Sequence, residues 1–220
     1  NTSEARQFLL NNGLPEIAKK YNLNYRFDGR DLEQKETFAD MKIGSIIGLL
    51  LIYIILAWVF KSWTRPFSIM IMIPFAFIGA VLGHYLLGLT MSILSMFALL
   101  ALAGIVVNNS IILVSTIERR FDDLLSQNDK DRQDDKVINE AIIAGVVDRF
   151  RPVLLTSLTT IGGLSALLFE KSLQAQFLIP MAATIVFGLG ITAFLVLVIV
   201  PSMMGISNDF SSFFKNIRRR

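Results

Sequence analysis

The chain has 220 residues, of which 53% are hydrophobic and 18% charged, and its mean hydropathy is +0.56. A soluble core of this size uses less apolar surface, so the composition predicts a membrane protein. Cysteine is absent, which excludes disulfides and thiolate metal sites. The net charge of +3 is small and the basic residues are not interleaved with aromatic ones, so nucleic-acid binding is not expected.

Residues 1–30 are polar enough to lie outside a bilayer. A helical pattern opens near Ser3, and the alternation in YNLNYRF, residues 21–27, indicates a strand. One helix and one strand cannot close a core alone, so we expect a small α/β remnant of a larger extramembrane domain. The alternative, a disordered tail, fits poorly with the apolar Phe8 and Phe27. The chain begins without methionine or a signal peptide, so we expect it to start inside a longer protein.

The charged residues are segregated and leave four long uncharged runs, at 43–60, 66–117, 152–169 and 172–208. About 20 apolar helical residues cross a hydrocarbon core, and a glycine-containing turn at 88–90 divides the longest run. The sequence therefore predicts an all-α polytopic membrane protein with five transmembrane helices. The predicted spans are 43–60, 66–87, 91–116, 152–169 and 178–204. The first span continues a helix that begins at Asp31, so one long helix covers 31–60.

Three kinds of residue refine these spans. We expect Pro66 and Pro152 in the first turns of their helices, where a missing N–H does no harm. The pair Gly79-x-x-x-Gly83 permits close helix packing. The single histidine, His84, lies near a helix end and is expected to be packed or interfacial rather than a metal ligand.

Positive charge selects the orientation of the five spans. Lys61, Arg65, seven basic residues in 117–151 and the basic tail 205–220 fall on one side. The connections between spans on the other side are a short turn with no basic residue and a loop with only Lys171. The positive-inside rule places the richer side in the cytoplasm, so the N-terminus is expected outside and the C-terminus inside. We expect 117–151 to be a solvated cytoplasmic loop that ends in an amphipathic helix on the membrane surface.

Two adjacent asparagines, Asn108 and Asn109, interrupt the third predicted span. At 1.5 Å per residue, Asn108 lies about 12 Å above the cytoplasmic end of that span. Thr159 lies at a similar depth in the fourth span and shares a helical face with Thr156. If the two spans are neighbours, the asparagine pair and the threonine face are expected to meet.

Three roles compete for this polar cluster. Asparagine and threonine form interhelical hydrogen bonds worth roughly 0.6 to 2 kcal/mol each, or they line a path for protons or ions. A catalytic role is the weakest of the three, because no Asp, Glu, Lys or Arg falls inside a predicted span. We therefore expect neither catalytic residues nor a bound metal or cofactor.

Three blocks of sequence are similar to one family: FKSWTRPFSIMIMIPFAFIGAVLGHYLLG, MSILSMFALLALAGIVVNNSIILV, and a third that begins DRFRPVLLTSLTT. They resemble the resistance-nodulation-division (RND) transporters, in the hydrophobe/amphiphile (acriflavine-resistance, AcrB/AcrD/AcrF-like) branch. Together with DGRDLEQKETFADM the resemblance covers nearly the whole chain, and RFRPVLLTSLTT is its most specific part.

This resemblance implies a C-terminal fragment of a twelve-span pump, made of the end of its second periplasmic insertion and its last five spans. The implied activity is substrate/proton antiport that exports drugs and amphiphiles across the bacterial inner membrane, with the proton gradient as its energy source. The implied partners are the missing N-terminal half, two further copies in a homotrimer, a periplasmic adaptor, an outer-membrane channel and the lipid bilayer. Alone, the chain is expected to be inactive.

The resemblance also implies a proton relay. Asn108 stands where the best-known pumps carry a lysine, Asn109 matches the residue after it, and Thr156 and Arg149 match a threonine and a basic residue of the eleventh span. Thr159 joins these candidates by its depth. Two alternatives remain: a non-transporting membrane interaction or packing module, and an RND relative that exports lipid or aids protein secretion.

Overall fold

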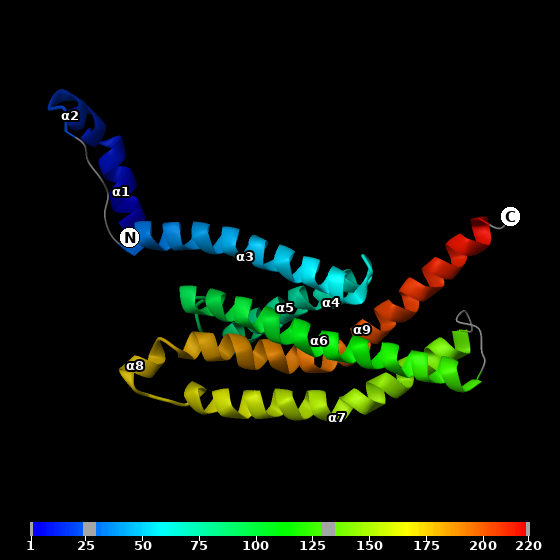
Figure 1. Ribbon diagram of the computed structural model, residues 1–220. Coiled ribbons are helices and arrows are strands. Elements are labelled where there is room, and N and C mark those ends of the chain that lie inside the picture. Colours follow the sequence, from blue (N-terminus) through cyan, green and yellow to red (C-terminus); the bar gives the residue numbers. More distant parts are fainter. Residues whose placement is uncertain (1, 24–29, 129–134, 219–220) are drawn as a thin grey trace. The chain divides into compact units, whose positions relative to one another are not determined.

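The computed structural model describes residues 2–23, 30–128 and 135–218, and every regular element among them is a helix (Figure 1). The all-α class predicted from the sequence is therefore confirmed. By its contacts the chain divides into two compact units, Asn1–Leu50 and Leu51–Arg220.

The first unit holds two short helices and the start of a long one. These are α1 (Thr2–Asn11), α2 (Leu14–Lys20) and the beginning of α3 (Arg30–Phe60). Gly13 joins α1 to α2 with φ of +102°, a conformation that glycine adopts without penalty. Residues 21–23 of the predicted strand form no strand, and residues 24–27 lie outside the described residues. Among the described side chains of this unit, 7–23 and 36–50, none is buried.

The second unit is a helix bundle. After the end of α3 its helices are α4 (Arg65–Met70), α5 (Met72–Leu87), α6 (Ile93–Asn128), α7 (Asp135–Leu168), α8 (Leu173–Gln176) and α9 (Ile179–Arg218). Pro66 lies in the first turn of α4, as predicted. Gly88 caps the C-terminal end of α5 with φ of +64° and ends that helix where the sequence predicts a turn.

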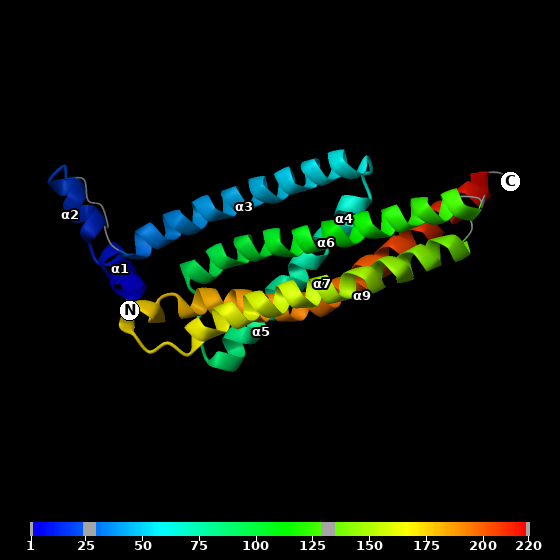
Figure 2. The ribbon, with the colours of Figure 1, turned by 60° about the horizontal axis from the view of Figure 1, so that its bottom comes forward.

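Helix α9 lies at the centre of this bundle and packs against α5, α6 and α7 (Figure 2). The core contains fully buried residues of α6 and α9, including Leu102, Leu113 and Leu189. A Cβ added at Gly79 would lie 2.9 Å from the backbone oxygen of Phe187, which is too close for any side chain. The small residues of α5 therefore let its backbone approach that of α9, which confirms the predicted close packing.

Four helical segments of the described chain are long and apolar enough to cross a membrane: Glu36–Phe60, Arg65–Leu87, Ile93–Ser126 and Ile179–Ser207. The fourth predicted span, 152–169, is helical to Leu168 as part of α7 but is not among them. It nevertheless packs along α6 and α9. Length and composition thus support four of the five predicted spans.

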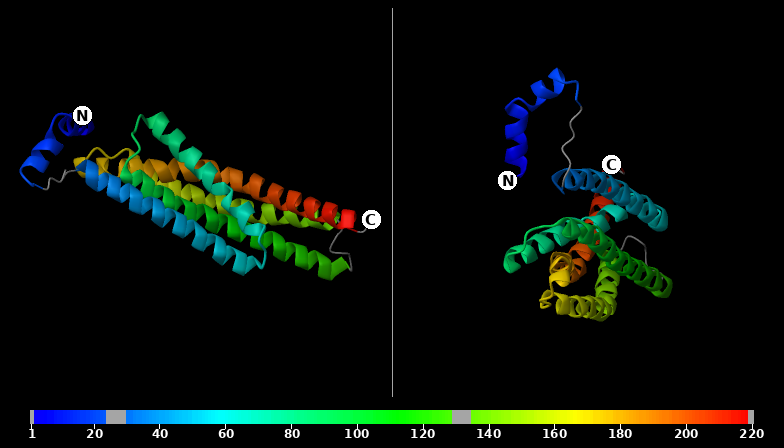
Figure 3. Two further views of the ribbon diagram at one scale, coloured as in Figure 1. Left: turned by 90° about the horizontal axis from the view of Figure 1, so that it is seen from above. Right: turned by 90° about the vertical axis from the view of Figure 1, so that its left-hand side faces the viewer.

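Two predictions about helix ends were wrong. Pro152 lies inside α7 rather than in its first turn, and α7 changes direction near its middle (Figure 1), as an interior proline causes. The first part of the expected loop at 117–151 is helical, because α6 continues to Asn128, whereas the helix expected at the end of that loop is present as the start of α7 at Asp135. Residues 129–134 lie outside the described residues. Where they approach residues 129–134, α6 and α7 lie side by side (Figure 1 and Figure 3).

Candidate functional site

The asparagine pair lies midway along α6. Asn108 is exposed and Asn109 half-buried, whereas the next residue, Ser110, is fully buried and donates a hydrogen bond to Val106 O at 2.8 Å. The side chain of neither asparagine makes a hydrogen bond in the described part of the chain. Asn108 therefore presents an amide on a surface of the bundle that this unit leaves uncovered.

The threonines of α7 are also exposed, and they bond to their own helix. Thr156 Oγ1 donates to the carbonyl oxygens of Pro152 and Val153, both at 3.1 Å, and Thr159 Oγ1 donates to Leu155 O at 2.9 Å. Helices α6 and α7 are neighbours, as expected. No hydrogen bond joins the asparagine pair to these threonines in the described residues, because each hydroxyl is used by its own helix.

Arg149 bridges the two helices below these polar groups. Its Nε donates to Thr116 Oγ1 at 2.6 Å, across 33 positions of sequence. One turn further along α6, Arg120 Nε donates to Asp148 Oδ2 at 2.6 Å. This hydrogen bond holds the pKa of the Asp148 carboxyl below its usual range. The sequence identified Arg149 only through the family pattern and missed its partner Thr116, because nothing local indicates a contact over such a separation.

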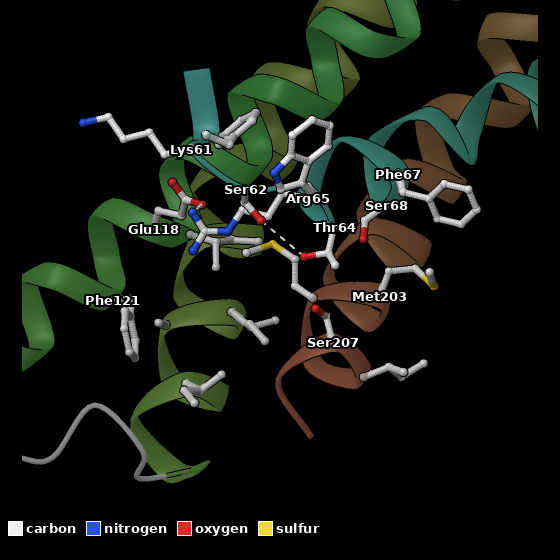
Figure 4. Close-up of a pocket in the computed structure, with 18 of the residues that line it drawn as sticks. Lys61, Ser62, Thr64, Arg65, Phe67, Ser68, Glu118, Phe121, Met203 and Ser207 are labelled. Carbon is white, nitrogen blue, oxygen red and sulfur yellow. Dashed lines mark hydrogen bonds and ion pairs between the residues drawn. The ribbon is translucent and has the colours of Figure 1, made fainter. Parts of the chain in front are cut away.

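A pocket of about 930 Å³ opens at the same end of the bundle (Figure 4). Its walls come from the end of α3, the connection 61–64, and α4, α6, α7 and α9. Arg65 of α4 forms an ion pair with Glu118 of α6 in this wall, and Ser62 and Thr64 share a hydrogen bond of 3.2 Å. The sequence analysis did not single out Glu118, because it follows the last apolar residue of its span.

The opposite end of the bundle holds a buried polar contact. His84 is only 3% exposed, and its ring bonds Ala80 O through Nδ1 and Ser95 Oγ through Nε2, both at 2.9 Å. Since a carbonyl only accepts, Nδ1–H of a neutral ring donates and Nε2 accepts from the serine hydroxyl. The predicted packed histidine is confirmed, and it ties the end of α5 to the start of α6.

The side chains described above limit the chemistry that the site can perform. In the residues that the structure describes, no three His, Asp or Glu side chains gather to hold a metal ion. The polar groups at membrane depth are amides and hydroxyls, which orient water and accept or donate hydrogen bonds. Apolar helices of this length are typical of a multi-pass integral membrane protein.

A sequence profile of the AcrB/AcrD/AcrF family matches residues 10–206. The chain therefore belongs to this family of RND transporters, and the resemblance recognised in the sequence is confirmed. It is 30% identical over 181 residues to the swarming motility protein SwrC of Bacillus subtilis, covering 82% of this chain and 16% of SwrC. It is 28% identical over 187 residues to the multidrug resistance protein MdtC of Proteus mirabilis, covering 84% and 16%.

A further relative is named for metals. The nickel and cobalt resistance protein CnrA of Cupriavidus metallidurans is 28% identical over 139 residues, covering 63% of this chain and 12% of CnrA. Among solved structures, a heavy metal efflux pump has the same fold, with a TM-score of 0.69 and 24% identity over 91% of this chain and 19% of the pump. The chain spans less than a fifth of the length of each of these relatives.

Proposed function

We propose that the chain is part of a proton-driven efflux transporter of the bacterial inner membrane, which exports drugs and other amphiphiles in exchange for protons. Its membership of the AcrB/AcrD/AcrF family supports this proposal. So do relatives named multidrug resistance proteins in several bacteria. The names of CnrA and SwrC refer instead to metals and to motility. The proposal that drugs are the substrate therefore rests on the relatives named multidrug resistance proteins.

The observation that carries the proposal is the uncovered polar face of α6 and α7. Asn108, Thr156 and Thr159 are exposed in this chain although they lie along apolar helices. Polar groups at that depth ordinarily face a partner or a water-filled path rather than lipid. We infer that spans from the rest of the transporter cover this face and bring the acid that binds the proton, with Asn108, Asn109, Thr156, Thr159 and Arg149 forming this chain's side of the path.

The proposed topology follows from the packing of α7. Because α7 runs along α6 and α9, we propose that it crosses the bilayer as the fourth of five spans, so that the N-terminus lies in the periplasm and the end of α9 in the cytoplasm. In the complete transporter we propose a homotrimer that works with a periplasmic adaptor and an outer-membrane channel.

Substitution in the full-length parent tests the relay. We expect Asn108→Ala and Thr156→Ala to raise drug susceptibility toward that of a strain without the pump, because each removes a polar group from the path, while trimer yield stays unchanged. Ser165→Ala is the matched control, since Ser165 is also a hydroxyl of α7 that bonds its own helix, through Gly162 O at 2.9 Å. Unchanged efflux at equal expression in both variants would contradict the relay role.

The alternative, a packing module that transports nothing, predicts another result. Such a module would bind a complete pump or itself through its exposed helix faces, and it would leave the pump active when its polar residues are changed. Light scattering of the purified chain and a pull-down with the remaining spans separate this alternative from a transporter part. Export of lipid, the third possibility, is tested by replacing the drug with a labelled lipid in the same assay.

A further inference from the structure

The pocket at the basic end of the bundle lies at the border between hydrocarbon and water. Phe60 ends the first apolar segment, Arg65 begins the next, and Glu118 directly follows the uncharged run 66–117. Trp63, which lines the pocket, is 78% exposed. Tryptophan is enriched at the level of lipid headgroups, so this position fits an opening onto one leaflet rather than onto bulk water.

The pocket walls are apolar on the membrane side. Phe60 and Ile117 are buried beneath the opening, whereas Phe67 and Ile206 are 64% and 58% exposed on its wall. The volume of about 930 Å³ lies within the range of small-molecule sites. Exposed apolar walls of this size at the membrane border suit an acyl chain.

The rim of the pocket is polar and carries an unpaired positive charge. Glu118 is the acid of the wall, and Arg65 neutralises it through their ion pair. Lys61 extends from the rim (Figure 4), and among the described residues no carboxylate pairs with it. Ser62 and Thr64 add hydroxyls beside it. Lys61 therefore leaves the rim with a net positive charge next to hydrogen-bonding groups.

From this arrangement we propose that the pocket binds an anionic phospholipid of the adjacent leaflet. The phosphate lies at the rim, on the Lys61 ammonium and the hydroxyls of the 61–64 connection, and the first part of one acyl chain lies against Phe67 and Ile206. The proposal depends on insertion in a membrane and does not depend on efflux. A zwitterionic phospholipid has the same acyl chains but no net charge. A preference for the anionic phospholipid over the zwitterionic one therefore reports recognition of charge by the rim.

The experiment uses the whole chain in detergent with brominated lipids, which quench nearby tryptophan. The chain has two tryptophans, so Trp58→Phe leaves Trp63 as the only reporter, in the pocket wall. We expect brominated phosphatidylglycerol to quench Trp63 at about fivefold lower concentration than brominated phosphatidylcholine, the preference that one lysine near a membrane surface confers. Equal quenching by the two lipids would overturn the proposal.

Four variants test which residues cause the preference for the anionic lipid. Lys61→Asn removes the charge, and asparagine tolerates the left-handed φ of 47° at this position, so we expect equal quenching by both lipids. Lys61→Arg should retain the preference. Ile206→Asp, on the exposed wall, should abolish it by adding a negative charge. Lys171→Asn, a lysine outside the pocket, is the matched control and should behave as the unmodified chain.

Three outcomes would overturn the proposal. A loss of preference in Lys171→Asn equal to that in Lys61→Asn would mean that general surface charge attracts the lipid. Competition by glycerol phosphate at the concentration of the lipid would mean that the rim binds free phosphate. Loss of the quenching when the remaining spans of the transporter are added would mean that protein fills the pocket.

Discussion

Hydroxyl and amide side chains behave differently in these helices. Ser110, Thr156 and Thr192 each donate to a carbonyl of their own helix, at 2.8 to 3.1 Å, so their polarity is satisfied without a neighbour. An asparagine has two N–H donors and one acceptor, more than one local carbonyl satisfies. Asn108, whose side chain is exposed and makes no hydrogen bond among the described residues, is thus the polar residue of α6 that most requires a partner from outside the chain.

The contact between His84 and Ser95 yields a prediction at the same scale. Ser95→Ala leaves Nε2 of a buried imidazole without its donor, at a cost of about 1 to 3 kcal/mol. Ser165→Ala, which removes only an exposed intrahelical hydrogen bond, should change stability by less than about 0.5 kcal/mol. Reversible unfolding in mixed micelles measures the free energy of unfolding of both variants. Equal losses of stability would mean that the Ser95 hydroxyl does not stabilise the buried His84 ring.

Between elements, the close approach of α5 and α9 depends on glycine. A Cβ at Gly79 meets backbone atoms of α9, which cannot turn aside, whereas a Cβ at Gly104 of α6 meets nothing within 4 Å. We expect Gly79→Ala to destabilise the bundle by about 1 to 3 kcal/mol through overpacking. Gly104→Ala should be neutral or stabilising, because alanine is the better helix former. The same unfolding assay compares them, and a neutral Gly79→Ala would contradict the packing.

The helix boundaries at Pro66 and Gly88 were easier to predict from the sequence than the points at which a helix continues beyond an apolar run. Pro66 and Gly88 were identified because each acts locally, through a fixed φ and through a left-handed φ. The continuation of α6 to Asn128 was missed because the end of an apolar run was taken as the end of the helix. Leaving the membrane removes lipid contacts but does not break backbone hydrogen bonds, and ERRFDDLL contains good helix formers. Pro152 was misplaced for the same reason.

Contacts over long separations were beyond the sequence. Arg65 with Glu118, Arg120 with Asp148 and Arg149 with Thr116 connect α4, α6 and α7 at one end of the bundle. Many charged residues lie near a membrane border, so the sequence alone does not indicate which of them form pairs. The polar positions at membrane depth were predictable because a polar residue in an apolar run is conspicuous, although their hydrogen bonds were not.

At the scale of the whole molecule, the Leu51–Arg220 unit is a bundle with one covered and one uncovered side. Its core is built around α9, whereas large apolar residues such as Phe194 and Val198 remain exposed on α9 itself. Lipid can cover these residues, but it cannot satisfy Asn108. The polar face therefore indicates where further protein is required, and apolar exposure alone does not.

Thiol labelling tests this requirement in a chain that has no cysteine of its own. We expect Asn108→Cys to react with N-ethylmaleimide in the detergent-purified chain and to be protected at least tenfold when the remaining spans are co-expressed. Ser110→Cys, at a position that is already fully buried, should react slowly in both samples, and Lys171→Cys, on an exposed loop, should react rapidly in both. Equal labelling of Asn108→Cys with and without the remaining spans would mean that lipid or water, rather than the rest of the transporter, covers this face of α6.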